Sequence, residues 1–310
     1  MTITNAVQTY LTQCTNVKKL EPLTLKAYKT DLRQFQEFMA DKAENISELD
    51  KVLVGSYIDY ISPQYRAKSL KRKAASLKAF FNFLEFEDII VVTPFRKIKL
   101  HIKEGKKIPK ALTLFDMEKV LSYLYNHKSK QTSQKRNVAL IELLFDTGIR
   151  ISELCNIRLT DIQIEAQTLS IRGKGNKERV VFLSNKYTLS ALKNYLVVRY
   201  MYAGEKNSPY LFINRIGNKY STESARLAIL SLGRKALGKH VTPHMFRHTF
   251  ATLLLEEGVD ITYIKSFLGH SSISTTQIYA ASTTYRQRQI LTTLHPRNRI
   301  RTVIPEEIAE

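Results

Sequence analysis

The first hundred residues carry apolar side chains at the spacing of amphipathic helices. Residues three or four apart along a helix lie on the same face, so such a repeat predicts a helix with one buried side. The repeat occurs twice here, at Leu25, Tyr28, Leu32, Phe35, Phe38 and Met39, and at Leu70, Ala74, Leu77, Phe80, Phe81 and Leu84. We therefore expect residues 1–100 to form an all-helical domain.

Basic side chains accompany the second of these repeats. We expect them on the face opposite the apolar stripe, and they are Lys68, Lys71, Arg72, Lys73 and Lys78. A charged outer face of a helix is often simply solvated, whereas clustered cations also bind phosphates. The sequence leaves both interpretations open.

The apolar repeat stops in a lysine-dense stretch, RKIKLHIKEGKKIPKALT, at residues 96–113. The stretch has no sustained helical period and contains Gly105 and Pro109, both of which disfavour a continuous helix. We predict an extended basic linker over residues 101–112, in which Lys106 and Lys107 are further candidates for phosphate contact.

A second set of elements follows, which we assign to a domain of residues 113–282. Thr113 is placed to cap a helix, and the apolar run at residues 138–145 predicts another helix that Gly148 ends. Within residues 168–183, two runs rich in β-branched side chains flank a glycine-rich turn, which is typical of a β-hairpin. The chain is thus predicted to be mainly α with a small antiparallel β-hairpin, an α+β fold in two domains.

Charge points to the class of partner. Lys and Arg number 48 against 28 Asp and Glu, a formal net charge of +20. Such a field attracts phosphate-bearing polymers, so DNA or RNA is the first partner to consider.

No apolar run is long enough to span a bilayer and the N-terminal MTITNAVQTY lacks a secretory signal, so we expect a soluble, cytoplasmic protein without membrane contact. Cys14 and Cys155 lack metal-ligand spacing, so we predict two buried thiols, no metal and no other cofactor.

Two cationic side chains occupy positions that favour an anion. Arg150 follows Gly148 and opens the helix ISELCNIRL, where it can bind an anion at the positive helix end or pair with Glu153 of the first turn. Lys174 lies in the glycine-rich turn of the hairpin, which allows close approach of a nucleic-acid backbone, although most turn lysines are only solvated.

A helix with two candidate histidines follows. Pro243 predicts the helix start, after which His244 and Arg247 share one face. A surface pair is the ordinary interpretation of such residues in a basic protein. His248 competes with His244 for the same role, and spacing does not separate the two.

The stretch LGHSSISTTQIY, residues 268–279, predicts a helix that ends on glycine, followed by His270 and then Tyr279. On base rates such a tyrosine is a core or interface residue. As a set, however, these candidates share one chemistry. Two arginines can clamp a phosphodiester, a lysine can protonate a departing alkoxide, and histidines can assist a tyrosine whose ordinary pKa of about 10 leaves it inert alone.

The order and setting of these residues resemble the tyrosine recombinase, or phage integrase, family, most nearly its Xer-type bacterial enzymes. The motifs are TGIRISEL, RGKGNKER, TPHMFRHTFAT and LGHSSISTTQIY, and the residues that match the family's catalytic set are Arg150, Lys174, His244, Arg247, His270 and Tyr279. The family's His-x-x-Arg motif selects His244 over His248. The resemblance spans essentially the whole chain, because the helical domain is similar to the family's core-binding, SAM-like domain.

This resemblance implies a C-shaped clamp on DNA and a metal-free transesterification, in which Tyr279 forms a 3′-phosphotyrosyl bond and releases a 5′-hydroxyl. It also implies a tetramer that joins two double-stranded DNA sites with inverted repeats, near the bacterial nucleoid; whether a second recombinase or an accessory protein takes part is open. Residues 283–310 would form a tail whose apolar Ile290, Leu291 and Leu294 are buried in a neighbouring protomer.

Two alternatives share parts of this picture. A type IB topoisomerase relaxes DNA by the same chemistry, and a catalytically silent DNA-binding regulator keeps only the fold. The small helical domain and the tail favour a recombinase over a topoisomerase, and the full set of catalytic-type residues disfavours the regulator. The sequence leaves open the DNA site and the choice among integration, excision and resolution.

Overall fold

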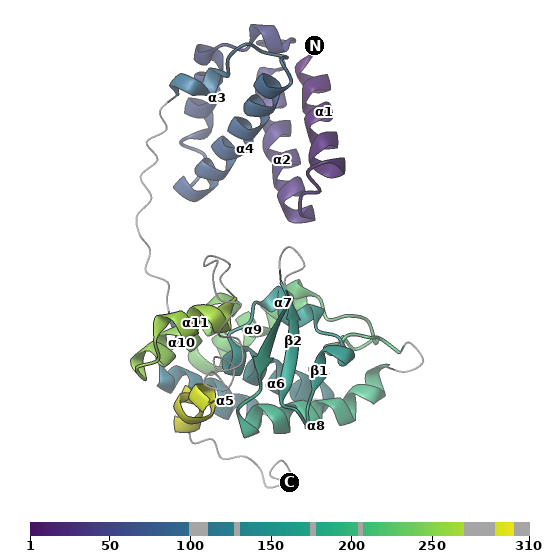
Figure 1. The fold of residues 1–310 in the computed structure, drawn as a ribbon, viewed down its shortest axis with the longest axis vertical. Coiled ribbons are helices and arrows are strands. Elements are labelled where there is room, and N and C mark those ends of the chain that lie inside the picture. The colour runs from purple at the N-terminus through teal and green to yellow at the C-terminus, as the bar shows by residue number, and fades with distance from the viewer. Residues whose placement is uncertain (99–110, 127–130, 174–177, 204–206, 270–288, 301–310) are drawn as a thin grey trace, which may run out of the picture. The chain divides into compact units, whose positions relative to one another are not determined.

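The chain folds into two compact units (Figure 1). Each unit has its own hydrophobic core. A computed structural model describes residues 1–98, 111–126, 131–173, 178–203, 207–269 and 289–300. The units comprise residues 1–107 and 108–310. The predicted combination of a helical domain and a mainly helical domain with a small antiparallel sheet is confirmed.

The N-terminal unit is a helical bundle built around aromatic side chains. Its elements are α1 (Ile3–Asn16), α2 (Pro22–Met39), α3 (Lys51–Ile61) and α4 (Ala67–Phe86), with the short 3₁₀ helices η1 (Ile46–Glu48) and η2 (Pro94–Lys97). Phe35 of α2 is fully buried and meets Tyr57 of α3 and Phe81 of α4 edge-on, with ring centroids 5.2 and 5.9 Å apart. Such pairs add to the free energy gained by burial. The predicted apolar repeats of α2 and α4 thus supply the core.

Lys73 of α4 does not lie on the outer face of its helix. Only 2% of its side chain is exposed, Nζ lies 3.1 Å from Oδ1 of the buried Asp31, and the ammonium stands 4.4 Å from the centre of the Tyr65 ring. Lys73 follows Leu70 by three residues and precedes Leu77 by four, so helical spacing places it on the apolar stripe. A buried ammonium requires such a charged partner. The prediction that Lys73 belongs to the exposed basic face is wrong.

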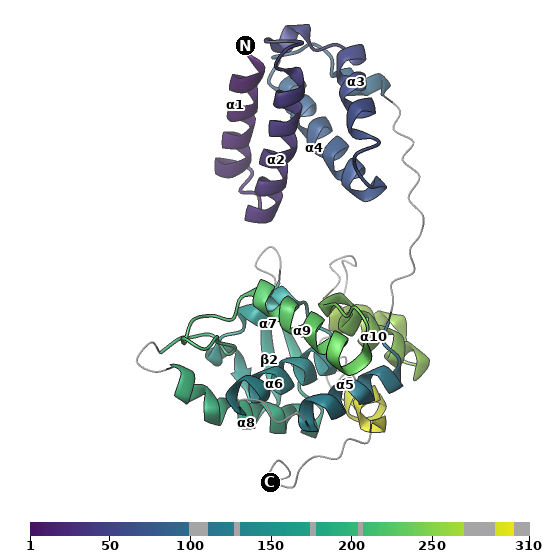
Figure 2. The same ribbon diagram turned by 180° about the vertical axis from the view of Figure 1, so that it is seen from behind.

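The C-terminal unit packs its helices around α6 and beside a small sheet (Figures 1 and 2). Its helices are α5 (Leu114–Asn126), α6 (Gln131–Thr147), α7 (Ile151–Asn156), α8 (Lys186–Ala203), α9 (Thr222–Leu237), α10 (Pro243–Glu256) and α11 (Ile261–Leu268), with the 3₁₀ helices η3 (Leu159–Asp161) and η6 (Pro296–Arg299). Helix α6 contacts α5, α7, α8 and α10, and residues 141–147 at its C-terminal end are all buried. It is therefore the central helix of this unit.

The described sheet is antiparallel, in the order β1 (Ile162–Gln163), β2 (Thr168–Arg172) and β3 (Glu178–Phe182). The predicted hairpin is confirmed as β2 and β3, with Thr168 opposite Phe182 and Arg172 opposite Glu178. Strand β1 escapes sequence-based prediction because two residues are too few to show the alternation of a strand.

Local signals set the ends of α5 and α6. Thr113 Oγ1 accepts a hydrogen bond from the backbone N–H of Asp116 at 3.0 Å, which caps α5 as predicted. Gly148 ends α6 with φ of +60°, and a Cβ at this position would lie 2.5 Å from Cδ1 of Phe250. Both the conformation and the close contact require glycine. The chain turns sharply at this residue, and α7 starts shortly afterwards with Arg150 as its N-cap.

Several further expectations concern the linker, cysteines and metals. Lys106 and Lys107 lie outside the described residues, whereas Leu112, which we placed in the linker, is 3% exposed and belongs to the core of the C-terminal unit. Cys14 and Cys155 are buried free thiols, as predicted. Among the described helices, none has the length and apolar character needed to cross a membrane. The same ranges contain no group of three or more His, Cys, Asp or Glu arranged to hold a metal ion.

The described part of the C-terminal segment, residues 289–300, packs on its own unit. Leu291 is 1% exposed and lies in a cluster with Phe250 of α10, against which Ile290 is half-buried, while Leu294 remains 37% exposed. The prediction that this tail keeps its apolar side chains for a neighbouring protomer is wrong for Leu291, because its own chain already buries that side chain. Residues 283–288 and 301–310 lie outside the described residues.

Replacing Arg297 by Met should destabilise the protein strongly. Nε and Nη2 of Arg297 donate to Glu142 of α6 at 3.0 and 2.9 Å, and both side chains are fully buried. Removal of one partner leaves a buried charge uncompensated, which costs about 3–5 kcal/mol. Urea unfolding of the full chain measures the loss. The matched control is Arg299→Met, because that guanidinium is 64% exposed and pairs with Glu257; there we expect less than about 1 kcal/mol, and equal losses would contradict the assignment.

Candidate active site

Arg150 stands at the start of α7, where its side chain is both held and accessible. Its backbone N–H donates to Oε2 of Glu153 and its Nη1 donates to Oε1, each at 2.9 Å. Of the Arg150 side chain, 40% is exposed. The pairing with Glu153 that the sequence left open therefore exists, and it still leaves guanidinium surface on which an anion can bind.

Arg247 connects the turn after α6 with the end of α11. It projects from α10, is only 9% exposed, and donates from Nη1 to the carbonyl oxygen of Gly148 at 2.8 Å and from Nη2 to that of Leu268 at 2.7 Å. Burial, and then repulsion by the Arg150 guanidinium, lowers the pKa of Arg247 to about 10. Arg247 is therefore still charged at neutral pH.

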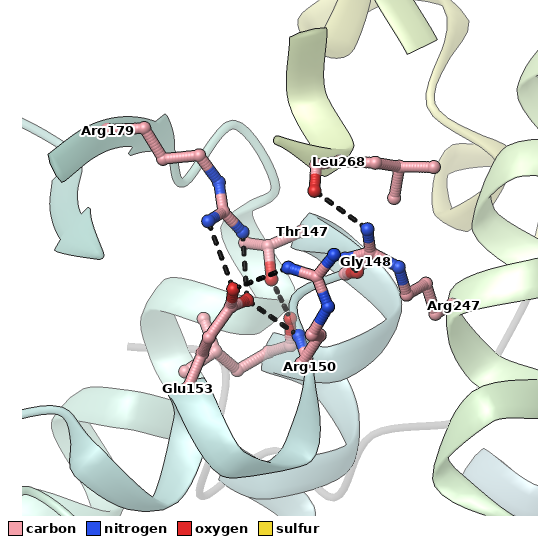
Figure 3. Close-up of polar contacts among 8 residues, drawn as sticks. Thr147, Gly148, Arg150, Glu153, Arg179, Arg247 and Leu268 are labelled. Carbon is pink, nitrogen blue, oxygen red and sulfur yellow. Dashed lines mark hydrogen bonds and ion pairs between the residues drawn. The ribbon is translucent and has the colours of Figure 1, made fainter. Parts of the chain in front are cut away.

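Arg179 of β3 completes the group, as Figure 3 shows. Its Nη1 and Nη2 donate to Oε1 and Oε2 of Glu153 at 3.2 and 2.9 Å. Burial by itself would raise the pKa of Glu153, but hydrogen bonds from Arg179 and Arg150 outweigh that effect and hold the pKa below its ordinary value. A Cβ on Gly269, which ends α11, would lie 3.0 Å from Cδ, Nε and Cζ of Arg179. Arg179 thus contacts both α7 and the end of α11.

The resulting cluster carries an excess of positive charge. The guanidinium groups of Arg150, Arg179 and Arg247 gather near one carboxylate, that of Glu153 (Figure 3). Besides burial, which is the larger effect, Arg150 and Arg179 both lower the pKa of Arg247, so the three cations are close enough to repel one another. An anion relieves that repulsion, and the planar guanidinium fork matches the oxygens of a phosphate. The arrangement is suited to binding a phosphodiester.

The other predicted catalytic residues are described only in part. His244 is the second residue of α10 and is exposed, whereas His248, about one turn later, is half-buried. Three of the six lie outside the described residues: Lys174, His270 and Tyr279. The elements that hold two of them are described, because β2 and β3 flank the turn of Lys174 and the left-handed Gly269 ends α11 directly before His270, as predicted.

Sequence reasoning missed Arg179 as a member of the site. Along β3 the side chains alternate, and Arg179 shares the inward face with Val181, which is 4% exposed. Arg179 also lies opposite the buried Ile171 of β2. An arginine at an inward position of a strand requires a carboxylate partner, and this alternation was the signal available in the sequence.

Family models match both units. The model of the phage integrase family matches residues 111–286, and that of the phage integrase N-terminal SAM-like domain matches residues 7–88. A tyrosine recombinase from Agathobacter rectalis is 42% identical over 299 residues, which cover 94% of this chain and 96% of that protein. Tyrosine recombinase XerC from Anoxybacillus flavithermus is 37% identical over 288 residues, which cover 90% of this chain and 94% of that protein.

Solved structures share the fold. The XerH site-specific recombinase bound to its palindromic difH substrate matches with a TM-score of 0.69 and 24% identity over 90% of this chain and 82% of that chain. The Tn1549 transposon integrase in complex with transposon right end DNA matches with a TM-score of 0.68 and 21% identity over 93% of this chain and 99% of that chain. With the fold, the family models and the relatives in agreement, the chain belongs to the phage integrase family of tyrosine recombinases, enzymes that break and rejoin DNA strands.

Proposed function

We propose that the protein is a site-specific recombinase that cuts and rejoins DNA through a covalent bond between Tyr279 and a 3′ phosphate. The observation that carries the proposal is the gathering of Arg150, Arg179 and Arg247 near Glu153, in the unit that the phage integrase model matches. Strand β3, which follows Lys174 in the sequence, contributes Arg179 to this cluster. The end of α11, which precedes His270 and Tyr279, meets it too.

The chemistry follows from the residue types. The exposed guanidinium of Arg150, together with Arg247, would bind the non-bridging oxygens of the scissile phosphate and stabilise the charge that develops on them. Tyr279 would attack the phosphorus and form the phosphotyrosyl ester, while Lys174 donates a proton to the departing 5′ oxygen. Histidines 244 and 270 would donate to the phosphate or accept the phenol proton. Because the ester conserves the energy of the broken bond, the released 5′-hydroxyl can rejoin without ATP.

We infer that the partner is double-stranded DNA with inverted repeats, bound by four protomers at two sites, and that the protein works in the cytoplasm at the nucleoid. The XerH and Tn1549 structures contain DNA. In this chain the candidate phosphate contacts outside the active site are Lys68, Lys71, Arg72 and Lys78 of α4 and the linker residues Lys106 and Lys107. Arg72 pairs with the buried Asp31 and keeps 46% of its side chain exposed, so its guanidinium is already oriented before DNA binds.

Replacing Lys71 and Lys78 by Gln should weaken DNA binding and flatten its salt dependence. Each lost phosphate contact lowers the slope of log K against log salt by up to about one. Fluorescence anisotropy with a half-site duplex at several salt concentrations measures that slope. The control removes two exposed lysines from other parts of the same unit, Lys19 and Lys51. The same loss of slope in both variants would indicate a general effect of net charge and would refute direct contacts from α4.

Two assays test the proposal as a whole. A duplex nicked near the cleavage position traps protein covalently on DNA, and a plasmid with two sites reports recombination; we expect both signals. Adducts with DNA relaxation but no exchange between sites would identify a type IB topoisomerase activity. Binding without adducts would identify a catalytically silent regulator.

A further inference from the structure

We propose that Arg179 is a positioning residue of the cleavage reaction, which joins the hairpin to Arg150 through Glu153. The inference rests on the proposed function, because it assigns a role within the phosphate-binding cluster described above. Arg179 would not contact the reacting atoms. It would hold the carboxylate of Glu153, and that carboxylate in turn orients Arg150, which would contact the scissile phosphate.

The first support is the set of hydrogen bonds that the Glu153 carboxylate accepts. The carboxylate is 7% exposed and accepts four described hydrogen bonds, two from Arg150 and two from Arg179. A bidentate guanidinium pair fixes the plane of a carboxylate, and here that plane determines where the backbone N–H and Nη1 of Arg150 can bind. Without Arg179, burial favours the protonated carboxyl group or a rotated side chain. In either case Arg150 loses part of its anchor.

The second support is the position of Arg179 in the hairpin. Arg179 pairs with Ile171 of β2. The next pair along the ladder, Arg172 with Glu178, is the last one before the connection that contains Lys174. The bond to Glu153 therefore pins the inner face of the hairpin to α7 at the base of that turn. The position of the hairpin and the position of Arg150 therefore depend on the same carboxylate.

The third support is the contact with the end of α11. Gly269 has φ of +64°, and Cδ, Nε and Cζ of Arg179 lie 3.0 Å from the position that a Cβ there would occupy. Arg247 holds the preceding carbonyl, that of Leu268. Arg179 and Arg247 thus meet the same helix end from β3 and α10, immediately before His270. A side chain that contacts α7 and α11 from the hairpin is suited to coordinating the parts of the site.

The test compares two arginines of the same hairpin. Arg179→Met removes the hydrogen bonds and keeps much of the side-chain length, while Arg172→Met removes a guanidinium that is 51% exposed and pairs with the exposed Glu178 and, at 3.5 Å, with Asp161. Full-length proteins are assayed for thermal stability, for half-site binding, and for single-turnover cleavage of nicked duplexes with either oxygen or sulfur as the bridging 5′ atom. Sulfur leaves without protonation, so it bypasses the proposed role of Lys174 but not that of Arg150.

We expect Arg179→Met to bind a half-site normally and to cleave both substrates about 10²-fold more slowly, the scale of effect that a small misplacement of a catalytic group produces. Arg172→Met should cleave as wild type. Glu153→Gln should share the defect, and the double variant with Arg179→Met should be no slower than the slower single variant, because both changes act on the same contact.

Three results would overturn the inference: equal cleavage by the Arg179 and Arg172 variants, restoration of the Arg179 variant by sulfur, or additive defects in the double variant. If Arg179→Met does not fold, Arg179→Lys decides, because it keeps the charge and loses the bidentate geometry; slow cleavage of both substrates supports the role, and wild-type cleavage overturns it. Absence of adducts with the wild-type protein would instead refute the proposed function, which keeps the two failures distinct.

Discussion

A Tyr279→Phe protein is expected to bind its half-site with wild-type affinity and to form no covalent adduct with DNA. The substitution removes one oxygen atom and leaves the size of the ring unchanged, so binding through arginines and lysines should persist. Phenylalanine offers no nucleophilic atom, and the loss is therefore complete rather than partial. A nicked half-site duplex, with the products separated under denaturing conditions, measures the adduct directly.

Neighbouring tyrosines provide the controls for this experiment. Tyr263 is half-buried on α11, and Tyr285 follows Tyr279 by six residues. Tyr263→Phe and Tyr285→Phe should both form adducts at the wild-type rate, since neither has the family's distance from the Leu-Gly-His motif. Adducts that persist in the Tyr279→Phe protein would assign the nucleophile to another residue.

A Lys174→Ala protein is expected to cleave an ordinary duplex about 10²- to 10⁴-fold more slowly, which is the usual contribution of a general acid. When the phenol attacks, the 5′ oxygen must leave as an alkoxide unless a proton reaches it. Lys174 lies between Gly173 and Gly175 in the sequence, and β3, the strand that follows it, is tied to Glu153 of the candidate site by the bond from Arg179. We therefore expect its ammonium to donate that proton.

Sulfur at the bridging 5′ position separates proton donation from phosphate binding. A thiol has an ordinary pKa of about 8.5, so the thiolate departs without protonation and cleavage by Lys174→Ala should recover. An Arg150→Ala protein should not recover, because the role proposed for Arg150 is to stabilise charge on the non-bridging oxygens, which the sulfur does not alter. If neither variant recovers, Lys174 positions the DNA and another group is the acid. Recovery of both would show that the substrate does not distinguish the two roles.

The fold was accessible from the sequence wherever one element contains its own signal. The apolar repeats of α2 and α4 became the aromatic core of the N-terminal unit, and Gly148 ended α6 where it was expected. The hairpin followed from its β-branched runs and glycine-rich turn. These signals act over a few residues, and for that reason one sequence without structural information is enough to detect them.

Errors arose where a side chain's surroundings depend on another element. Lys73 was assigned to the exposed basic face of its helix because of its charge, yet Asp31 on a different helix supplies the partner that allows its burial. Leu291 was assigned to a neighbouring protomer because of its apolar side chain, yet it is buried in a cluster with side chains of α10 and α11 of the same chain. Both partners lie far away in the sequence, and helical spacing carries no information about them.

The sequence by itself determined the helices, the hairpin and the set of residue types that phosphodiester cleavage requires, because these depend on composition and local spacing. Only the tertiary structure decided how the charges of the site are shared. Glu153 binds Arg150, three residues before it, and helical spacing predicted that this pair could form. Glu153 also binds Arg179, twenty-six residues after it, and sequence spacing gave no indication of that pair. The second bond exists because the tertiary fold brings Arg179 of β3 within reach of Glu153 on α7. Arg247, likewise, is buried because α10 lies over the turn at Gly148 and reaches the end of α11.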